Sequence, residues 1–285
     1  FQNRSCLFWL QFRLRSAGYL QTISISTPPW RDMEALTESL AKKIDELRIK
    51  TKVEKVVLIG HSMGGPVSLE AARLMPGRTR GVIGVDTFQN VESEWDPEQR
   101  KAMLEAMEAD FIAFCTTFVT GMFAEGADQA LVSMISDDMC GGPAEIGSSL
   151  MRNFADYDRA LAMQSAGVPI RAVNATLWPT APEVNRKYAD FDATIIDGVG
   201  HYLFLEKPEE FNTALTVAQQ LPPPDRRLEI SLENLAKLYE HQRKDFATAL
   251  KHARQTLRVE GREGRTRRLH RLRRRLRRAG PTGTR

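Results

Sequence analysis

The chain has 285 residues, 42% of them hydrophobic, and a net charge of +4. This length allows one large domain with a sizeable core, plus a small appendage. No apolar run reaches the length that a membrane-spanning helix needs, so we expect no transmembrane segment. Residues 261–285 hold eleven arginines against one acidic residue, Glu263, and the rest of the chain is net negative. The basic character therefore belongs to the tail and excludes a uniformly basic surface.

Three cysteines, Cys6, Cys115 and Cys140, stand at spacings that match no metal site. Their odd and sparse count argues against a disulfide scaffold and favours a reducing compartment. We therefore predict a cytoplasmic protein without a bound metal or cofactor.

Strand and helix patterns alternate along the chain after residues 1–30. That segment is atypical, with strand character at Tyr19–Ser26 and a short apolar run at Cys6–Phe12 that we read as a buried strand or as the result of a truncation. Continuous apolar runs indicate strands buried on both faces, and apolar residues at three- and four-residue steps indicate helices. In chain order the patterns predict a helix at Arg31–Ile49, a strand at Val56–Ile59, a helix at Val67–Leu74, strands at Gly81–Val85, Ile170–Val173 and Ala193–Ile196, and a helix at Pro208–Leu221.

Residues 92–165 carry helix patterns, including Pro97–Ala109 and Phe111–Phe123, and no convincing strand. Strands that alternate with helices predict an α/β fold whose mainly parallel sheet is flanked by helices. The helical block between two of the strands then reads as an inserted lid. We expect one such domain over residues 31–221.

The turn Gly60-His61-Ser62-Met63-Gly64 lies between a buried strand and a helix. A sharp strand-to-helix turn exposes a serine hydroxyl, and its crowded flanks favour Gly60 and Gly64. The helix that follows points its first amides at developing negative charge, so the Met63 N–H is a candidate oxyanion donor. We predict Ser62 as a nucleophile and His61 as a structural residue.

Three segments together resemble the α/β-hydrolase fold superfamily, in particular its branch with a helical lid. They are VEKVVLIGHSMGG followed by a helix, then GVIGVD, then GVGHYLFLEKPEEF. The resemblance covers roughly residues 31–221. It implies a Ser–His–acid triad at the carboxyl ends of parallel strands, but it does not imply a substrate.

The resemblance places the catalytic base at His201, which follows a strand through a glycine-containing loop. The acid is less constrained, because the strand Ile170–Val173 is followed by Asn174 where many family members carry Asp. We favour Asp86, directly after the strand Gly81–Val85. Glu183, Asp197 and a missing or substituted acid remain the alternatives.

Family members also carry an early loop that supplies a second oxyanion donor, and residues 1–30 contain no recognisable counterpart. Losing one such donor raises a reaction barrier by about 3 kcal/mol. We therefore expect a weakly active or incomplete site in the chain as it stands.

The predicted lid is rich in large apolar side chains, which line an acyl pocket or pack the lid on the core. The pocket candidates are Phe111, Phe114, Phe118 and Met122.

Pro222-Pro223-Pro224 separates the hydrolase-like region from residues 225–260, which predict a helical hairpin. Residues 232–257 resemble a single tetratricopeptide unit, and one unit cannot bury its own apolar face. A protein partner through this hairpin is the functional interpretation, and a generic hairpin is the alternative. We expect the arginine-rich tail of residues 261–285 to be a disordered basic tail, with binding to nucleic acid or an anionic surface as the rival.

These patterns predict a serine hydrolase that cleaves a small to medium apolar ester, or a related acyl bond, in a small-molecule substrate. The rival from another class is a non-catalytic or weakly active hydrolase-fold protein with a C-terminal interaction module.

Overall fold

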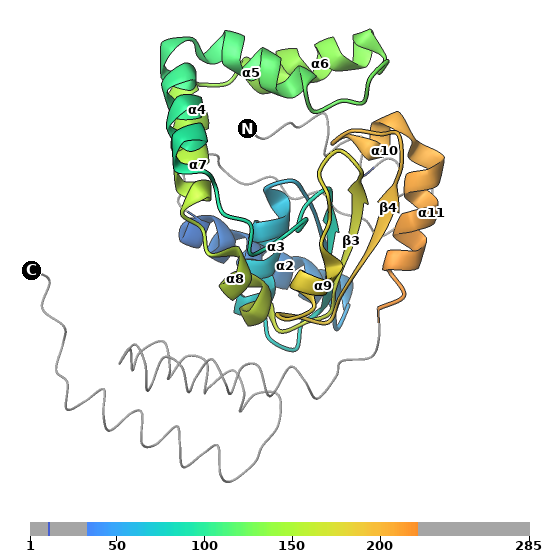
Figure 1. Ribbon diagram of the computed structural model, residues 1–285. Coiled ribbons are helices and arrows are strands. Elements are labelled where there is room, and N and C mark those ends of the chain that lie inside the picture. Colours follow the sequence, from blue (N-terminus) through green and yellow to red (C-terminus); the bar gives the residue numbers. More distant parts are fainter. Residues whose placement is uncertain (1–10, 12–32, 222–285) are drawn as a thin grey trace, which may run out of the picture.

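The computed structural model describes residue 11 and residues 33–221 of the chain (Figure 1). The predicted strand at Tyr19–Ser26, the hairpin of residues 225–260 and the basic tail lie outside the described residues. Within this part, helices and strands alternate as the apolar patterns predict. The element order is α2 (Met33–Thr51), β1 (Val56–His61), α3 (Gly64–Leu74), β2 (Thr79–Val85), α4 (Pro97–Ala109), α5 (Phe111–Thr120), α6 (Gln129–Cys140), α7 (Ala144–Ala155), α8 (Arg159–Ala166), β3 (Ile170–Ala175), α9 (Pro182–Asn185), β4 (Phe191–Ile196), α10 (Leu203–Glu206) and α11 (Pro208–Ala218).

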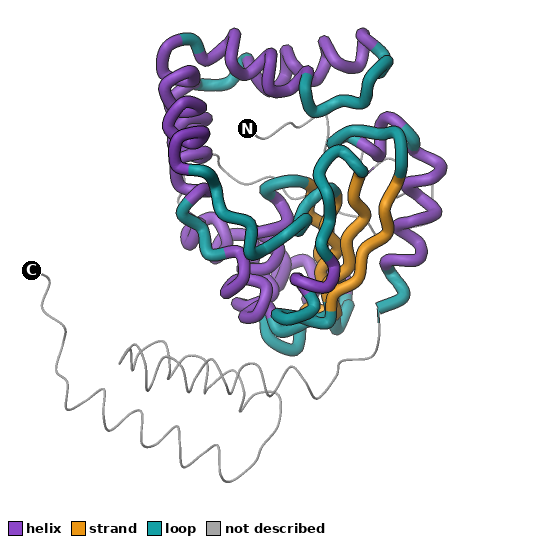
Figure 2. The backbone as a smooth tube through the Cα atoms, in the orientation of Figure 1, coloured by secondary structure: helices purple, strands orange, loops and turns teal. Residues whose placement is uncertain are grey.

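The four strands form one parallel sheet in the order β1-β2-β3-β4. All neighbouring pairs are parallel, so the carboxyl ends of the four described strands emerge at the same edge. Figure 2 shows the strands side by side in orange. In an open parallel sheet this edge is where a binding or catalytic site is built, because the loops after the strands meet there.

Helices cover both faces of the sheet, and the alternation of side chains along β2 shows how. Val82 packs in one apolar cluster with Leu69 of α3. Ile83, the next residue, packs in the other cluster with Phe211 of α11. In Figure 1, α11 accordingly lies on one side of the strands, and α2, α3 and α8 lie on the other. Burial on both faces is the reason why the strands read as continuous apolar runs.

The segment between β2 and β3 contains the helices α4 to α8, which we call the insertion. Four of these helices begin at an aspartate whose carboxylate accepts a hydrogen bond from a backbone N–H of the first turn. Such caps satisfy amides that have no partner inside the helix, and each stabilises the helix by about 1 kcal/mol. The capping residues are Asp96, Asp110, Asp128 and Asp158.

The predicted helix Phe111–Phe123 ends earlier in the structure, at Thr120. Gly121 follows as the C-cap, and its N–H donates to the Thr117 carbonyl oxygen. The chain then leaves the helix, and the Met122 carbonyl oxygen accepts a hydrogen bond from the N–H of His201. The helix is therefore three residues shorter than the apolar pattern predicts.

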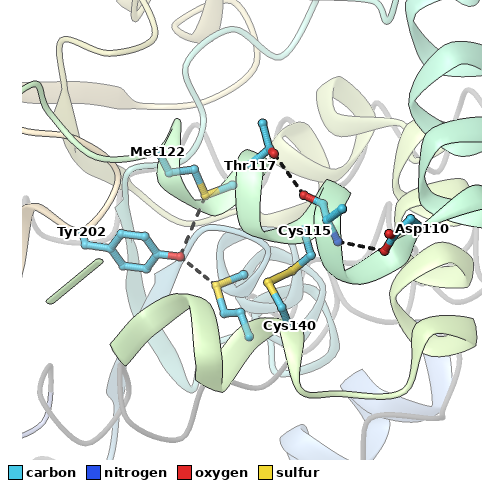
Figure 3. Close-up of a disulfide and its surroundings, with 8 residues drawn as sticks. Asp110, Cys115, Thr117, Met122, Cys140 and Tyr202 are labelled. Atoms are coloured by element: carbon cyan, nitrogen blue, oxygen red, sulfur yellow. Dashed lines mark hydrogen bonds between the residues drawn. A yellow bond between two sulfur atoms is a disulfide. The ribbon is translucent and has the colours of Figure 1, made fainter. Parts of the chain in front are cut away.

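The cysteine count argues against a disulfide scaffold, and the described residues contain one disulfide bond. Cys115 of α5 and Cys140 of α6 are joined by a disulfide bond (Figure 3), with their Cα atoms 5.6 Å apart. The two residues are separated by 25 positions in sequence, and only the packing of α5 against α6 brings them together. A disulfide is more typical of oxidising compartments, so the cysteines give no support to the cytoplasmic prediction.

Replacing Phe211 with Ala tests how much the packing of α11 on one face of the sheet stabilises the fold. Its side chain is fully buried against the strands, so we expect the free energy of unfolding to fall by about 3–5 kcal/mol in urea denaturation. Val217→Ala is the control on the same helix, because 55% of its surface is exposed and we expect a change of about 0.5 kcal/mol or less. Equal losses in the two variants would contradict this packing.

Candidate active site

Ser62 occupies a strained turn at the carboxyl end of β1. Its φ angle is 53°, in the left-handed region that non-glycine residues rarely adopt. The Ser62 N–H donates to the carbonyl oxygen of Val85, the last residue of β2, at 3.0 Å. Its own carbonyl oxygen accepts from the Gly65 N–H, also at 3.0 Å. The turn is therefore held by the neighbouring strand and by the start of α3, which together compensate the strain.

The glycines around Ser62 are not equivalent. A Cβ atom on Gly60 would lie 2.1 Å from the Gly64 carbonyl oxygen, which is a backbone clash. A Cβ atom on Gly65 would lie 2.5 Å from the Thr87 side chain, whereas one on Gly64 would meet nothing within 4 Å. Close approach of the chain to itself thus requires glycine at position 60 and leaves position 64 sterically open.

Met63 is the N-cap residue of α3. Among the residues that the structure describes, no group accepts a hydrogen bond from its N–H. This amide therefore stands at a helix N-terminus without a partner, which suits it to bind an anionic oxygen.

Asp86 follows β2 directly and is almost completely buried, with 2% of its surface exposed. Its N–H donates to the Val173 carbonyl oxygen of β3 at 2.9 Å. Carboxylate oxygen Oδ1 accepts from the Ala175 N–H at 2.9 Å, and Oδ2 lies 2.5 Å from Nδ1 of His201. Each carboxylate oxygen of this buried group thus has a donor, as burial of a charge demands.

His201 lies in the loop after β4, with 4% of its surface exposed. Besides the Asp86 contact, its backbone N–H donates to the Met122 carbonyl oxygen at 2.6 Å. Gly200, just before it, has no room for a side chain, because a Cβ atom would lie 2.2 Å from the same oxygen. The edge of the Trp178 ring lies near the imidazole, with the ring centres 5.3 Å apart. The backbone bond to Met122 of the insertion and the contact with Asp86 therefore hold His201 in place.

Glu183 and Asp197, the other acid candidates, do not contact His201. Glu183 lies in α9 with no hydrogen-bond or ion-pair partner among the described residues. Asp197 uses its backbone carbonyl oxygen to accept from the ammonium of Lys207 at 2.8 Å. Of the predicted acids, only Asp86 meets the imidazole.

Asn174 stands at the end of β3, where the sequence offers no acid. Its Oδ1 accepts from the Thr87 N–H at 3.1 Å, and its Nδ2 donates to the Thr180 hydroxyl at 3.0 Å. The amide therefore braces the loop that follows Asp86, with its oxygen as acceptor and its NH₂ group as donor.

The predicted pocket residues occupy two environments. Phe111 and Met122 are buried in the cluster that joins the insertion to the sheet. Phe114 and Phe118 are only partly buried, and their rings stack at 5.8 Å. The sequence did not predict two further side chains that lie near the site, Trp178 and Glu206. For Glu206 the only signal in the sequence was its closeness to His201.

His61 packs beneath the candidate base. Its Nε2 lies 3.0 Å from the His201 carbonyl oxygen, and its ring centre is 4.4 Å from that of His201 and 5.1 Å from that of Phe204. Burial lowers the pKa of His61 well below its ordinary value of 6.5, and the nearby His201 lowers it further. A neutral imidazole held by a backbone carbonyl suits the structural role predicted for it.

The sequence model that represents the alpha/beta hydrolase family matches residues 7–214 of this chain. This chain belongs to the alpha/beta hydrolase family. The match begins before residue 31, where the sequence motifs first showed the resemblance. No curated protein sequence matches the chain.

Solved structures with the same fold include three proteins of low sequence identity. A bromoperoxidase from Bacillus anthracis is 18% identical, with a TM-score of 0.60, over 76% of this chain and 87% of that protein. An esterase from Exiguobacterium antarcticum is 18% identical, with a TM-score of 0.58, over 75% and 86%. The enol-lactonase from Burkholderia xenovorans LB400 is 18% identical, with a TM-score of 0.53, over 69% and 75%. At this identity the likeness establishes the fold and leaves the reaction open.

Two negative findings apply to the described residues. No helix among them is both long and apolar enough to cross a membrane. No group of three or more His, Cys, Asp or Glu side chains among them could hold a metal ion.

The two motif glycines offer a matched test of the turn. We expect Gly60→Ala to reduce folded protein and to destabilise what folds by several kcal/mol, since backbone must move to make room. Gly64→Ala should change the free energy of unfolding by less than about 1 kcal/mol, because its Cβ atom meets nothing. Urea denaturation of both variants measures the difference, and similar losses would contradict the geometry.

The lowered pKa of His61 predicts a pH dependence of stability. Below about pH 6.5 the unfolded chain binds a proton at this residue and the folded chain does not, so the free energy of unfolding falls as the pH falls. One such group contributes at most about 1.4 kcal/mol per pH unit. We expect His61→Gln, which keeps a donor for the carbonyl, to flatten this decline in urea denaturation between about pH 5 and pH 7. Parallel curves for the two proteins would contradict the prediction.

Proposed function

We propose that this chain is a serine hydrolase that cleaves small to medium apolar esters, or related acyl bonds, with Ser62, His201 and Asp86 as its triad. The observation that carries the proposal is the 2.5 Å contact between the His201 ring and the buried Asp86 carboxylate. It occurs at the sheet edge where the strained Ser62 turn is bonded to the end of β2. A buried acid that orients a histidine beside a serine turn is the arrangement that acyl transfer requires.

In the proposed reaction, His201 accepts the Ser62 proton as the hydroxyl attacks the substrate carbonyl carbon. It then gives this proton to the leaving group, and the acyl–serine ester is hydrolysed by water through the same steps. Asp86 accepts a hydrogen bond from Nδ1, so it fixes the tautomer that leaves Nε2 free to act as the base. The Met63 N–H is one donor to the oxyanion.

Family membership and an esterase of the same fold support hydrolysis as the reaction class. An apolar substrate is supported by the partly buried aromatic side chains of the insertion and by Trp178, 38% exposed beside His201. Ser62 argues against dehalogenase or epoxide-hydrolase chemistry, which in this fold uses an aspartate nucleophile.

Labelling with a fluorophosphonate probe tests the nucleophile. We expect the folded protein to be labelled, and Ser62→Ala to abolish the labelling, because the probe reacts only with an activated serine. Folded wild-type protein that resists the probe would favour the rival, a non-catalytic hydrolase-fold protein.

Replacing Asp86 with Asn tests the acid. We expect turnover of a p-nitrophenyl ester to fall by up to about 10⁴-fold without being abolished, because the imidazole loses its orientation and its counter-charge. Asp192→Asn is the control, since Asp192 pairs with Arg186 near the amino end of β4, away from His201. Unchanged turnover in Asp86→Asn would reject this residue as the acid.

A further inference from the structure

Glu206 is a half-buried residue whose carboxylate lies close to the candidate site. It has no role in the proposed reaction. It is the last residue of α10, five positions after His201. Both of its oxygens lie 3.0 Å from the Gly200 backbone nitrogen, and Oε2 also accepts from the Ala124 N–H at 3.2 Å. One side chain thus binds two backbone amides that are far apart in sequence.

These amides belong to the loop that contains His201 and to the insertion. Gly200 immediately precedes His201. Ala124 lies in the stretch of the insertion between α5 and α6, two residues after Met122, whose carbonyl oxygen accepts from the His201 N–H. The loop that contains Gly200 and His201 is therefore joined to residues 122–124 of the insertion in two ways. One is the backbone hydrogen bond between His201 and Met122, and the other runs through the Glu206 carboxylate.

The neighbouring side chain reinforces the same junction. The Tyr202 ring stacks on Phe123 with their centres 4.8 Å apart, and its hydroxyl lies 2.8 Å from the Met139 sulfur. Figure 3 shows Tyr202 reaching the insertion close to Met122 and the Cys115–Cys140 disulfide. The insertion therefore contacts the residues on both sides of His201.

Within the part of the chain that the structure describes, the Glu206 carboxylate accepts hydrogen bonds from these two amides and from no other group. The adjacent Lys207 sends its ammonium to the Asp197 carbonyl oxygen and to Glu210, not to Glu206. No cation pairs with the Glu206 carboxylate among the described residues. Hydrogen bonds from N–H groups to a carboxylate are stronger than those to a neutral acceptor, so they suit a task of holding a loop.

We propose that Glu206 is a positioning residue that couples the insertion to the histidine of the site. By binding the Gly200 and Ala124 amides together, its carboxylate fixes where the His201 loop stands against the edge of the insertion. It acts through His201 and touches no reacting atom. Its effect on turnover rests on the proposed hydrolase function, whereas the coupling of the two segments does not.

The test compares Glu206→Gln, Glu206→Ala and the control Glu209→Gln in the full chain. Gln keeps one acceptor oxygen and Ala keeps none, while Glu209 is an exposed residue of α11 whose side chain has no partner among the described residues. We expect kcat for a p-nitrophenyl ester, per active site titrated with a fluorophosphonate, to fall about tenfold in Gln and about a hundredfold in Ala. KM should change by no more than about threefold, and Glu209→Gln should behave as wild type.

Hydrogen–deuterium exchange supplies a readout that is independent of activity. We expect the amides of Gly200 and Ala124 to lose protection together in both Glu206 variants, while the amides of β2 and β3 keep theirs. A merely structural residue would instead lower protection throughout the sheet, or lower the titrated active fraction and leave kcat per site unchanged. If Glu206→Ala does not fold, Glu206→Gln decides.

The outcomes separate this proposal from the proposed function. Glu206 variants with wild-type kcat per site, or with unchanged exchange at Gly200 and Ala124, would overturn the coupling. A wild-type protein that resists fluorophosphonate would reject the hydrolase function alone. In that case joint deprotection of the two amides would still establish the coupling, and its absence would overturn it.

Discussion

A buried carboxylate, Asp86, holds the imidazole of a residue 115 positions further along the chain. Such a group is tolerated inside a protein only when its charge is satisfied, and here the donors come from β3 and from the loop after β4. The contact therefore depends on the register of three strands. A shift of one residue between β2 and β3 would separate the carboxylate from the Ala175 amide and from His201.

The same sheet carries the strain of the serine turn. Ser62 adopts a positive φ angle, and its N–H is bonded to the end of β2, one residue before Asp86. Asp86 itself also has a positive φ, of 45°. Strained residues of this kind persist where the surrounding structure fixes them, and they gather at functional sites. In this chain both lie at the edge that the helices on the two faces of the sheet hold in place.

The insertion contacts the candidate site directly. Its helices α4, α5 and α6 share one apolar cluster with β2, β3 and α11, and its Met122 carbonyl oxygen accepts a hydrogen bond from the His201 N–H. The disulfide joins α5 to α6 on either side of the stretch that meets the histidine loop. Fixing the two helices to each other limits how far that stretch can move, because a cross-link restricts the conformations available to the chain between its ends.

The sequence by itself determined the α/β class, the order of the strands and helices in the described region, and the positions of Ser62, His201 and Asp86 as candidates. The class and the serine turn rest on local features, because burial on both faces produces apolar runs and a crowded turn demands glycine. The positions of His201 and of the acid rest on the resemblance to the family. The choice between Asp86, Glu183 and Asp197 as the acid could not be settled in this way, because any carboxylate after a strand satisfies the same local rule.

Only the tertiary structure decided which carboxylate meets His201, which cysteines pair, and that Glu206 binds two distant amides. Each of these depends on segments that are far apart in sequence and adjacent in space. Residue type and spacing record which groups are available for such contacts. The packing of the insertion against the parallel sheet selects the contacts that form, because each buried polar group must find its partner there.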